Sequence, residues 1–122
     1  MELIFEKEVE DIRGKILFLS YGKKQINLVE IRKGFARGGH YHQTETSHFL
    51  ILGKIEYREE NISTGQEKIS VIEAPHILNI PSNHAHLLIA LEDTIFFEFF
   101  EEYEATNFPR YRNIVENKMN LK

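Results

Sequence analysis

The chain has 122 residues, a hydrophobic content of 42% and a formal net charge of −4. This length suits a single domain with a buried core, and this hydrophobic content excludes an intrinsically disordered chain. The net negative charge argues against a nucleic-acid partner, because binding to phosphates requires an excess of positive charge. Cysteine is absent, which excludes disulfides and thiolate metal ligands.

The sequence carries no sign of membrane insertion or secretion. No apolar run reaches the 18 residues that a transmembrane helix would need. The N-terminal stretch "MELIFEKEVEDIRGK" starts with an acidic, alternating pattern and lacks the basic region and the apolar core of a secretory signal. We therefore expect a cytoplasmic protein without a membrane partner.

Short runs rich in Ile, Leu, Val, Phe and Tyr alternate with turn residues along most of the chain. These runs cover 15–21, 25–32, 47–52, 54–60, 68–73, 76–80, 84–91 and 93–102. Their regular spacing predicts an all-β sandwich or barrel. The apolar run "LIL" at 50–52 is typical of a strand that is covered on both faces.

The last part of the chain, "NFPRYRNIVENKMN" at 107–120, has a different character. Pro109 lies early in it, where a helix tolerates proline. Four apolar side chains recur at helical spacing on one stripe: Tyr111, Ile114, Val115 and Met119. We predict a barrel over 1–106 and a short helical tail over 107–122.

Five of the six histidines fall in two short stretches, 40–48 and 84–86. In a strand, residues two apart point to the same face, so His40 and His42 would project together, as would His84 and His86. Imidazole is a good ligand for Zn, Fe, Mn, Ni and Cu. The two H-x-H pairs therefore indicate a metal site or a site of catalytic histidines.

Residues 34–53, "GFARGGHYHQTETSHFLILG", resemble the first motif of the cupins: a Gly, an H-x-H pair, usually a Glu, and a closing Gly. Residues 81–86, "PSNHAH", resemble the second cupin motif, P-x-G-x-x-H, with Asn83 in the place of the usual Gly. The resemblance implies a double-stranded β-helix, the cupin barrel related to jelly rolls, here followed by a short C-terminal helix. It also implies that one divalent transition metal (Zn, Fe, Mn or Ni) is held inside the barrel by His40, His42 and His86.

The position of the family's Glu departs from the motif. Ser47 stands there, with Thr46 before it, and the segment up to Gly53 is one residue shorter than in the family. If Ser47, Phe49 and Ile51 face inward, His48 faces outward. Three alternatives follow: Glu45 or His48 is a fourth ligand in a shifted register, the site has three histidines alone, or the histidines act without a metal. The register argument disfavours His48 and leaves Glu45 as the candidate fourth ligand.

"RGGHYHQTETSHFL" further resembles cupins that act on nucleotide-linked 4-keto sugars, namely the 3,4-ketoisomerases and the cupin half of capsular-polysaccharide reductase-epimerases. In such a site Arg37 would form a forked contact with a phosphate or carboxylate of the substrate. The alternative is a surface arginine in a loop. Tyr57, through its aromatic face, and His84 are further candidates for substrate binding, whereas Tyr41 should point away from the pocket.

Glu98 lies in "IFFEFF", between two pairs of phenylalanines. If it faces the barrel interior, burial would raise its pKa and suit it to acid or base catalysis. If it faces out, a partner or the tail helix must cover the phenylalanines beside it. Glu98 joins His40 and His42 as the candidate catalytic residues.

These features predict a metal-binding cupin that acts on a small polar molecule, with an isomerase or epimerase acting on a nucleotide-linked keto sugar as the leading hypothesis. A three-histidine Fe(II) dioxygenase is the enzymatic alternative, and a ligand-binding cupin without activity is the other. We also expect a homodimer, because the N-terminal strand and the apolar "IFFEFF" segment need cover.

Overall fold

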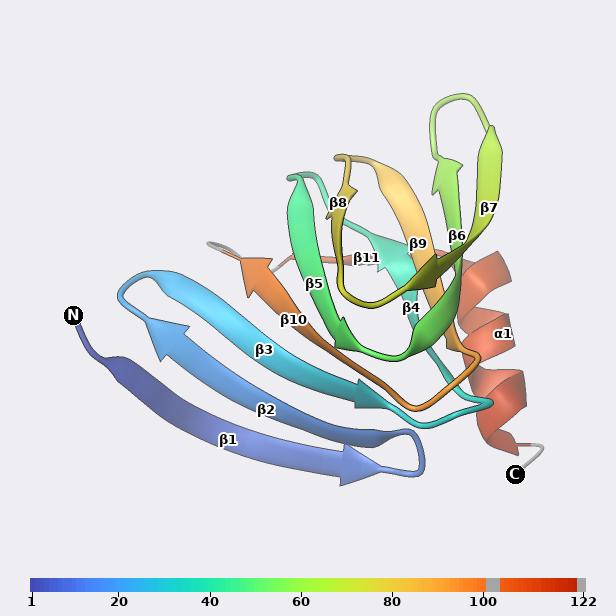
Figure 1. Cartoon of the computed structure of the whole chain (residues 1–122). Helices are drawn as coiled ribbons and strands as arrows, with labels where there is room; N and C mark the ends of the chain where they lie inside the picture. Colours follow the sequence, from blue (N-terminus) through green and yellow to red (C-terminus); the bar gives the residue numbers. More distant parts are fainter. Residues whose placement is uncertain (101–103, 121–122) are drawn as a thin grey trace.

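The computed structural model describes residues 1–100 and 104–120, which form two antiparallel sheets and a C-terminal helix (Figure 1). The first sheet has the strand order β1-β2-β3-β10-β5-β8. Its strands are β1 (Leu3–Asp11), β2 (Gly14–Tyr21), β3 (Lys24–Ile31), β10 (Thr94–Phe100), β5 (Thr46–Leu52) and β8 (His76–Ile80). The eight apolar runs of the sequence each coincide with a strand to within a few residues, which confirms the all-β prediction.

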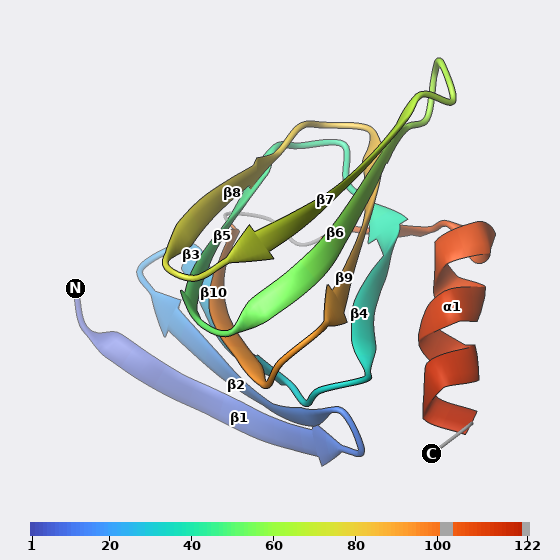
Figure 2. The same cartoon turned by 45° about the vertical axis from the view of Figure 1, so that its right-hand side comes forward.

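The second sheet has the order β11-β4-β9-β6-β7 and faces the first across the barrel interior (Figure 2). Its strands are β11 (Thr106–Asn107), β4 (Ala36–Tyr41), β9 (His84–Ala90), β6 (Lys54–Asn61) and β7 (Glu67–Glu73). The helix α1 (Pro109–Asn120) packs outside the barrel along β4. None of the described helical structure is long and apolar enough to cross a membrane.

The main core fills the space between the two sheets. Its buried side chains come from both: Val29, Ile31, Phe35, Leu50, Ile55, Tyr57, Leu78, Ile80, Leu88, Ala90 and Phe96. A second cluster lies between the helix and the outer face of β4 and β9, and comprises Ala36, Ala85, Leu87, Ile89, Tyr111 and Val115. Tyr41 also packs there, away from the barrel interior, as the sequence predicts.

Strand β9 is covered on both faces, which explains why its residues after His84 are all buried. His86 and Leu88 point into the barrel, whereas Leu87 and Ile89 point to the helix. The apolar stripe of the tail packs against the barrel: Tyr111 and Val115 are the buried side chains of α1.

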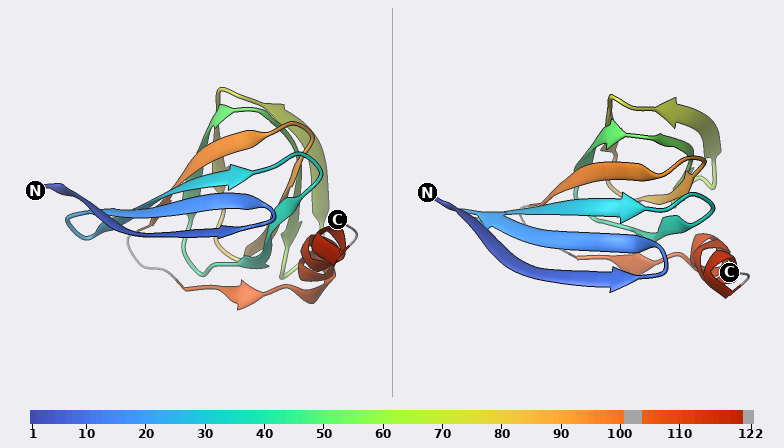
Figure 3. Two further views of the ribbon diagram at one scale, coloured as in Figure 1. Left: turned by 90° about the horizontal axis from the view of Figure 1, so that it is seen from below. Right: turned by 60° about the horizontal axis from the view of Figure 1, so that its bottom comes forward.

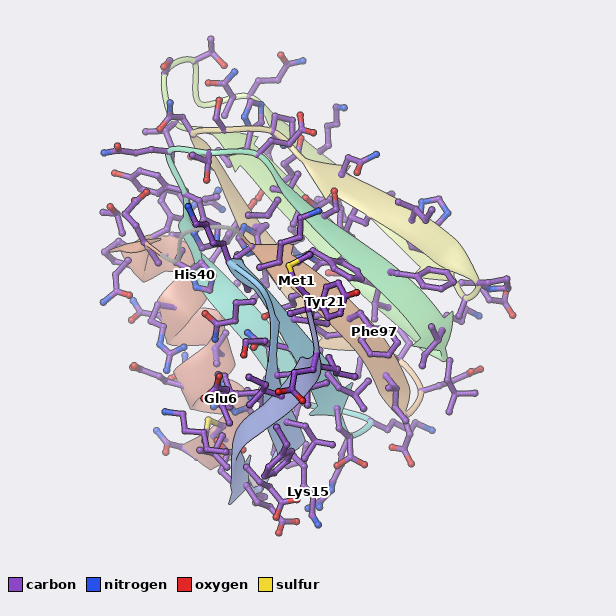
Figure 4. All side chains as sticks on the ribbon, turned by 90° about the vertical axis from the view of Figure 1, so that its left-hand side faces the viewer. Met1, Glu6, Lys15, Tyr21, His40 and Phe97 are labelled. Carbon is purple, nitrogen blue, oxygen red and sulfur yellow. The ribbon has the colours of Figure 1, made fainter. Side chains whose placement is uncertain are left out.

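The outer face of the first sheet is open in the single chain. Strand β1 is the outermost strand, and all nine of its residues are exposed (Figure 3). The expectation that 50–52 is covered on both faces is wrong for this chain alone, because Ile51 is 40% exposed and Leu52 is 55% exposed. Phe97, labelled in Figure 4, lies on this outer face and is paired across the strands with Phe49 and Leu28.

Candidate metal centre

His40, His42 and His86 converge inside the barrel. His40 and His42 lie at the end of β4, and His86 lies on the neighbouring strand β9, where it is the direct partner of His40. The ring centroids are 4.6 Å apart for His40 and His86, 4.9 Å for His40 and His42, and 5.5 Å for His42 and His86. One potential ligand atom of each ring lies within 4.8 Å of the other two.

Glycine in β4 makes this close approach possible. The β4–β9 register shifts between Gly38 and His40, and a bulge of this kind turns the following side chain. Gly38 has a φ of 108°, and a Cβ at this position would lie 2.6 Å from the backbone oxygen of His86. A side chain here would push β4 away from β9, so Gly38 sets the spacing of the histidines.

A backbone hydrogen bond joins the two histidine motifs. The Asn83 N–H donates to the carbonyl oxygen of His42 at 2.8 Å. Asn83 has a φ of 56°, the left-handed conformation that asparagine tolerates better than most residues, so it replaces the usual Gly without loss of the turn. On its other side, the His42 ring is held by a hydrogen bond between Nδ1 and the carbonyl oxygen of Glu104.

Burial keeps imidazoles of the cluster neutral at neutral pH. His86 is 2% exposed, and desolvation lowers its pKa well below the ordinary value. Desolvation, followed by the nearby His42 and His48, lowers the pKa of His40 to about 4. Neutral imidazole is the form that binds a metal ion, so the low pKa values favour metal binding.

The cluster fits a divalent transition metal. The Nδ1 atom of His86 is buried and has no hydrogen-bond partner among residues 1–100 and 104–120, an arrangement that is costly in a protein interior. Three converging imidazoles are a donor set that Zn, Fe, Mn, Ni and Cu accept. His40, His42 and His86 are thus the residues that would hold the metal.

The register of β5 differs from the expectation. Thr46, His48 and Leu50 face inward and are buried, whereas Phe49 and Ile51 are exposed. The prediction that His48 faces outward is therefore wrong. The connection between β4 and β5 is short, so the first inward-facing residue of β5 is Thr46 and not Ser47. Because side chains alternate along a strand, this difference of one residue reverses the expected face of every later side chain of β5.

Two residues of the β4–β5 region consequently have roles other than those expected. Ser47 lies away from the interior, and its hydroxyl donates to Oδ1 of Asn79 at 2.8 Å. Glu45 is exposed on the connection, and the group of possible metal ligands in the described residues does not include it. Thr46 takes the inner-face position that was expected for Ser47. Its Oγ1 is buried and has no hydrogen-bond partner among the described residues.

His48 lies behind the histidine cluster. Its ring stacks on Phe96 with a centroid distance of 5.2 Å and meets His86 edge to face at 5.9 Å. Its Nε2 lies 3.5 Å from Oε1 of Glu98. Burial lowers the pKa of His48 to about 4, so this imidazole is neutral as well.

Glu98 points into the barrel from β10. Its side chain is 21% exposed, and Oε2 accepts a hydrogen bond from Nδ2 of Asn27 at 3.2 Å. Desolvation raises the pKa of Glu98, although the Asn27 hydrogen bond and the charge of Arg37 act in the opposite direction. A carboxyl with a raised pKa in a cleft is suited to hold and release a proton.

Glu98 and His40 line one cavity of about 410 Å³ together with Arg13, Arg37 and Arg112. Arg37 is buried there and is not a surface residue of a loop: its Nε donates to the Glu30 carbonyl at 2.9 Å and its Nη2 to the Gly14 carbonyl at 3.2 Å. The cavity therefore brings together one histidine of the cluster, His40, a protonatable carboxyl and a buried cation.

Two candidate substrate-binding residues lie elsewhere. Tyr57 belongs to the main core, and its hydroxyl donates to Oε1 of Glu59 at 2.8 Å. His84 is half-buried at the start of β9, where its Nδ1 is hydrogen-bonded to the Ser82 carbonyl oxygen at 2.9 Å. Neither lines the cavity that holds Glu98 and His40.

Sequence reasoning missed most residues that line the cavity, among them Asn27, Arg13 and Arg112. Asn27 had a detectable signal, since it is a polar residue within the apolar run "QINLVEIR". Arg13 lies at the turn between β1 and β2 and Arg112 lies on α1, and both reach the cavity through tertiary packing alone.

No protein-family model and no curated protein sequence matches the chain. Solved structures do match it. Oxalate decarboxylase from Bacillus subtilis, a protein with Mn(II) centres, aligns with a TM-score of 0.73 and 19% identity over 96% of this chain and 35% of its own. A further structure of oxalate decarboxylase aligns with a TM-score of 0.73 and 20% identity over 87% of this chain and 31% of its own.

The capsular polysaccharide assembling protein CapF from Staphylococcus aureus aligns with a TM-score of 0.67 and 20% identity. The alignment covers 84% of this chain and 30% of CapF, so the chain spans about a third of the length of these solved chains. Identities this low establish the shared architecture of the barrel and not a shared activity. The two packed sheets, the converging histidine motifs and these structural neighbours together show that the chain has the cupin fold.

Proposed function

We propose that this protein is a metal-dependent isomerase or epimerase that moves a proton at the carbon beside a carbonyl group of a small polar substrate. A keto sugar linked to a nucleotide is the substrate class that the first histidine motif supports. The observation that carries the proposal is the position of Glu98: a carboxyl with a raised pKa shares one cavity with His40 of the histidine cluster. Carbonyl polarisation and proton transfer can thus occur at one substrate.

In this proposal the three histidines bind the metal, and Glu98 transfers the proton. His40, His42 and His86 would hold the metal, which supplies a Lewis acid for a carbonyl oxygen when bound. The Mn(II) centres of oxalate decarboxylase support a divalent metal in this fold. The substrate carbonyl would then lie beside His40, at the boundary between the cluster and the cavity.

Glu98 is the proposed acid and base. Asn27 fixes one carboxyl oxygen by a hydrogen bond, so the orientation of the carboxyl is set before a substrate arrives. His48 lies 3.5 Å from the other oxygen. Burial lowers the pKa of His48 to about 4, so this neighbour is uncharged at neutral pH and does not compete with Glu98 for the proton.

A second candidate, a three-histidine Fe(II) dioxygenase, is supported by Thr46. This residue takes the inner-face position on β5 at which a carboxylate would be expected, and the cluster is made of three histidines. Three protein ligands leave coordination positions for oxygen and substrate. Oxygen uptake by the Fe(II)-loaded protein in the presence of substrate would favour this candidate over the isomerase.

The test combines metal analysis with hydrogen exchange. The purified protein should contain about one equivalent of divalent metal, and it should exchange the hydrogen beside the carbonyl of a nucleoside-diphosphate 4-keto-6-deoxyhexose for deuterium in D₂O. His86→Ala should lose both metal and exchange. Glu98→Gln should retain the metal and lose exchange by about 100-fold or more, as expected for a general acid–base residue. Unchanged exchange in Glu98→Gln, or wild-type protein that binds no metal, would refute the proposal.

A further inference from the structure

We propose that Gln25 and Asn27 are positioning residues that hold the Glu98 carboxyl in both of its protonation states by reversing the direction of two hydrogen bonds. The use of the Glu98 proton on a substrate rests on the proposed function, whereas the hydrogen-bond chain itself stands on contacts within the protein. The observation that carries the proposal is the pair of partners of the buried Asn27 side chain. Within the described residues, these are Glu98 and a second amide, that of Gln25.

The three side chains form a chain of hydrogen bonds across two neighbouring strands. Gln25 and Asn27 stand two residues apart on β3 and therefore point to the same face, and Glu98 is the direct partner of Asn27 on β10. Nε2 of Gln25 donates to Oδ1 of Asn27 at 3.3 Å, and Nδ2 of Asn27 donates to Oε2 of Glu98 at 3.2 Å. All three residues line the cavity that contains His40.

An amide can serve either protonation state of the carboxyl. When Glu98 is ionised its oxygens only accept, so Asn27 must present Nδ2 to it, as it does in the structure. When Glu98 is protonated at Oε2, this oxygen becomes a donor, and a half-turn of the Asn27 amide presents Oδ1 to it. Nδ2 of Asn27 then points to Gln25, which can accept with Oε1 after a half-turn of its own. Asn27 is 4% exposed, and both of its polar atoms keep a partner in either direction.

Gln25 has the freedom that this reversal requires. Its side chain is half-buried, and its bond to Asn27 is the only hydrogen bond that it makes within the described part of the chain. A half-turn of the Gln25 amide therefore breaks no other contact of this kind. The exposed part of the side chain also leaves water able to hydrate the end that does not face Asn27.

The amide pair interrupts an otherwise apolar surface. Val29, the next inward residue of β3, belongs to the main core, and Ile16 and Phe18 of β2 line the same cavity. Apolar side chains would satisfy the packing of this wall, so the two amides need another reason to stand beside Glu98. The competing explanation is a rigid brace, in which Asn27 donates to Glu98 at all times and Gln25 only satisfies Asn27.

The proposed reaction takes Glu98 through both protonation states in each turnover. The C–H bond beside the substrate carbonyl breaks, its electron pair moves towards the carbonyl oxygen, and the proton goes to the Glu98 carboxylate. Return of this proton to carbon restores the carboxylate. A chain that reverses supports the carboxyl before and after the transfer, whereas a rigid brace supports the ionised form alone.

The first test follows the direction of the chain in metal-free, isotope-labelled protein, so that neither a metal nor a substrate is needed. The carboxyl ¹³C resonance of Glu98 gives its titration, and nuclear Overhauser contacts show which neighbour the Asn27 NH₂ group faces. We expect this group to contact Glu98 above the midpoint and Gln25 below it. Contact with Glu98 at both ends of the titration would overturn the proposal.

Two substitutions of opposite charge should each fix the chain in one direction. Gln25→Glu introduces a carboxylate, which only accepts, so the Asn27 NH₂ group should face away from Glu98 throughout the titration. Gln25→Lys introduces a group that only donates, so Asn27 should face Glu98 throughout. Both variants should slow hydrogen exchange beside the substrate carbonyl by about tenfold or more, because one state of Glu98 then lacks its hydrogen bond. An effect of charge alone would change exchange in opposite directions in the two variants.

The controls separate the chain from its surroundings. The same two substitutions at Gln66, which is exposed between β6 and β7, should change neither the contacts nor the exchange. Every variant keeps the other charged or titratable groups around Glu98, which are Arg13, Arg37, His40, His42, His48 and Arg112. Circular dichroism identifies variants that fail to fold, and if both Gln25 variants fail, the contacts in the wild-type protein decide.

The outcomes distinguish this proposal from the proposed function. Opposite changes of exchange in the two Gln25 variants, or Asn27 contacts that neither variant alters, would overturn the reversing chain. Reversal of the contacts in a wild-type protein that lacks exchange activity would support the chain and count against the proposed function alone.

Discussion

Thr46 and His48 stand two residues apart on the inner face of β5, and each has a buried polar atom without a partner in the described residues. Both belong to the wall of the barrel that runs past the histidine cluster. Inner-face residues of β5 can therefore alter the site, whereas their outward-facing neighbours cannot.

Thr46→Glu should strengthen metal binding. A carboxylate on the inner face would add an oxygen donor of the kind that divalent metals accept, and we expect the dissociation constant to fall about tenfold or more. Metal release to a competing chelator measures this change. Ser47→Glu is the matched control, because the same side chain would point away from the interior. Equal effects of the two substitutions would contradict the register of β5.

His48 should make the metal-free protein sensitive to acid. Its pKa in the folded chain is about 4 against an ordinary value of 6.5, so the unfolded state binds more protons between these values. The unfolding free energy should accordingly fall as the pH drops through this window. His48→Gln should reduce that loss by up to about 3 kcal/mol, as measured by urea unfolding at pH 4 and pH 7. His76→Gln, on the exposed side of β8, should leave the loss unchanged.

Glu98 should have the opposite dependence on pH. Its pKa is raised, so the folded state holds the proton more tightly and the unfolding free energy falls as the pH rises above the ordinary value of about 4.3. Glu98→Gln removes the ionisation and should stabilise the protein at pH 8 more than at pH 4. Thermal unfolding at the two pH values tests this, with Glu92→Gln on the exposed β9–β10 turn as the control. Stabilisation independent of pH would contradict the buried position of Glu98.

The open face of the first sheet should mediate self-association. Phe49, Ile77 and Phe99 are exposed on it at 37%, 63% and 40%, and contiguous apolar patches of this kind mark interaction sites. We propose a second copy of the chain as the partner, so light scattering should give a dimer at micromolar concentration. Phe49→Arg should shift the protein towards the monomer. Val71→Arg, equally apolar and 61% exposed on the other sheet, should not.

The all-β character of the chain and the shared side of His40 and His42 were predictable because both depend on local patterns, whereas the cupin barrel and the three-histidine cluster were implied by the family resemblance. Alternating apolar runs determine the strands, and the H-x-H spacing places His40 and His42 on one side whichever strands pair. Asn83 could be recognised as a substitute for glycine because the left-handed conformation is a property of single residues. The resemblance of the two motifs to those of the cupins implied that His86 joins His40 and His42, and the direct cross-strand pairing of His40 with His86 is a finding of the structure.

The register of β5 and the environment of Arg37 could not be predicted from local sequence patterns. A difference of one residue in a connection reverses the face of every following side chain, and the sequence around Thr46 contains no feature that fixes the length of the turn. Arg37 is buried by the turn at Gly14 and by β3, which are brought to it by tertiary packing. Tyr57 was assigned to a sugar site, but aromatic residues occur in protein cores as well as in sugar sites. Nothing in the sequence indicated that its hydroxyl donates to Glu59, a contact that belongs to a core position.

The pairing of β4 with β9 has a consequence for the helix. The strands that carry the three histidines on their inner faces present their outer faces to α1, through Leu87 and Tyr111 among others. A metal ion bound by His40, His42 and His86 would link β4 to β9. The chain segment between these strands would then be a closed loop, which has a lower conformational entropy than an open one. Loss of the ion would therefore weaken both the contact between β4 and β9 and the packing of α1 against them. The packing of α1 should thus depend on whether a metal occupies the histidine site on the other face of the sheet.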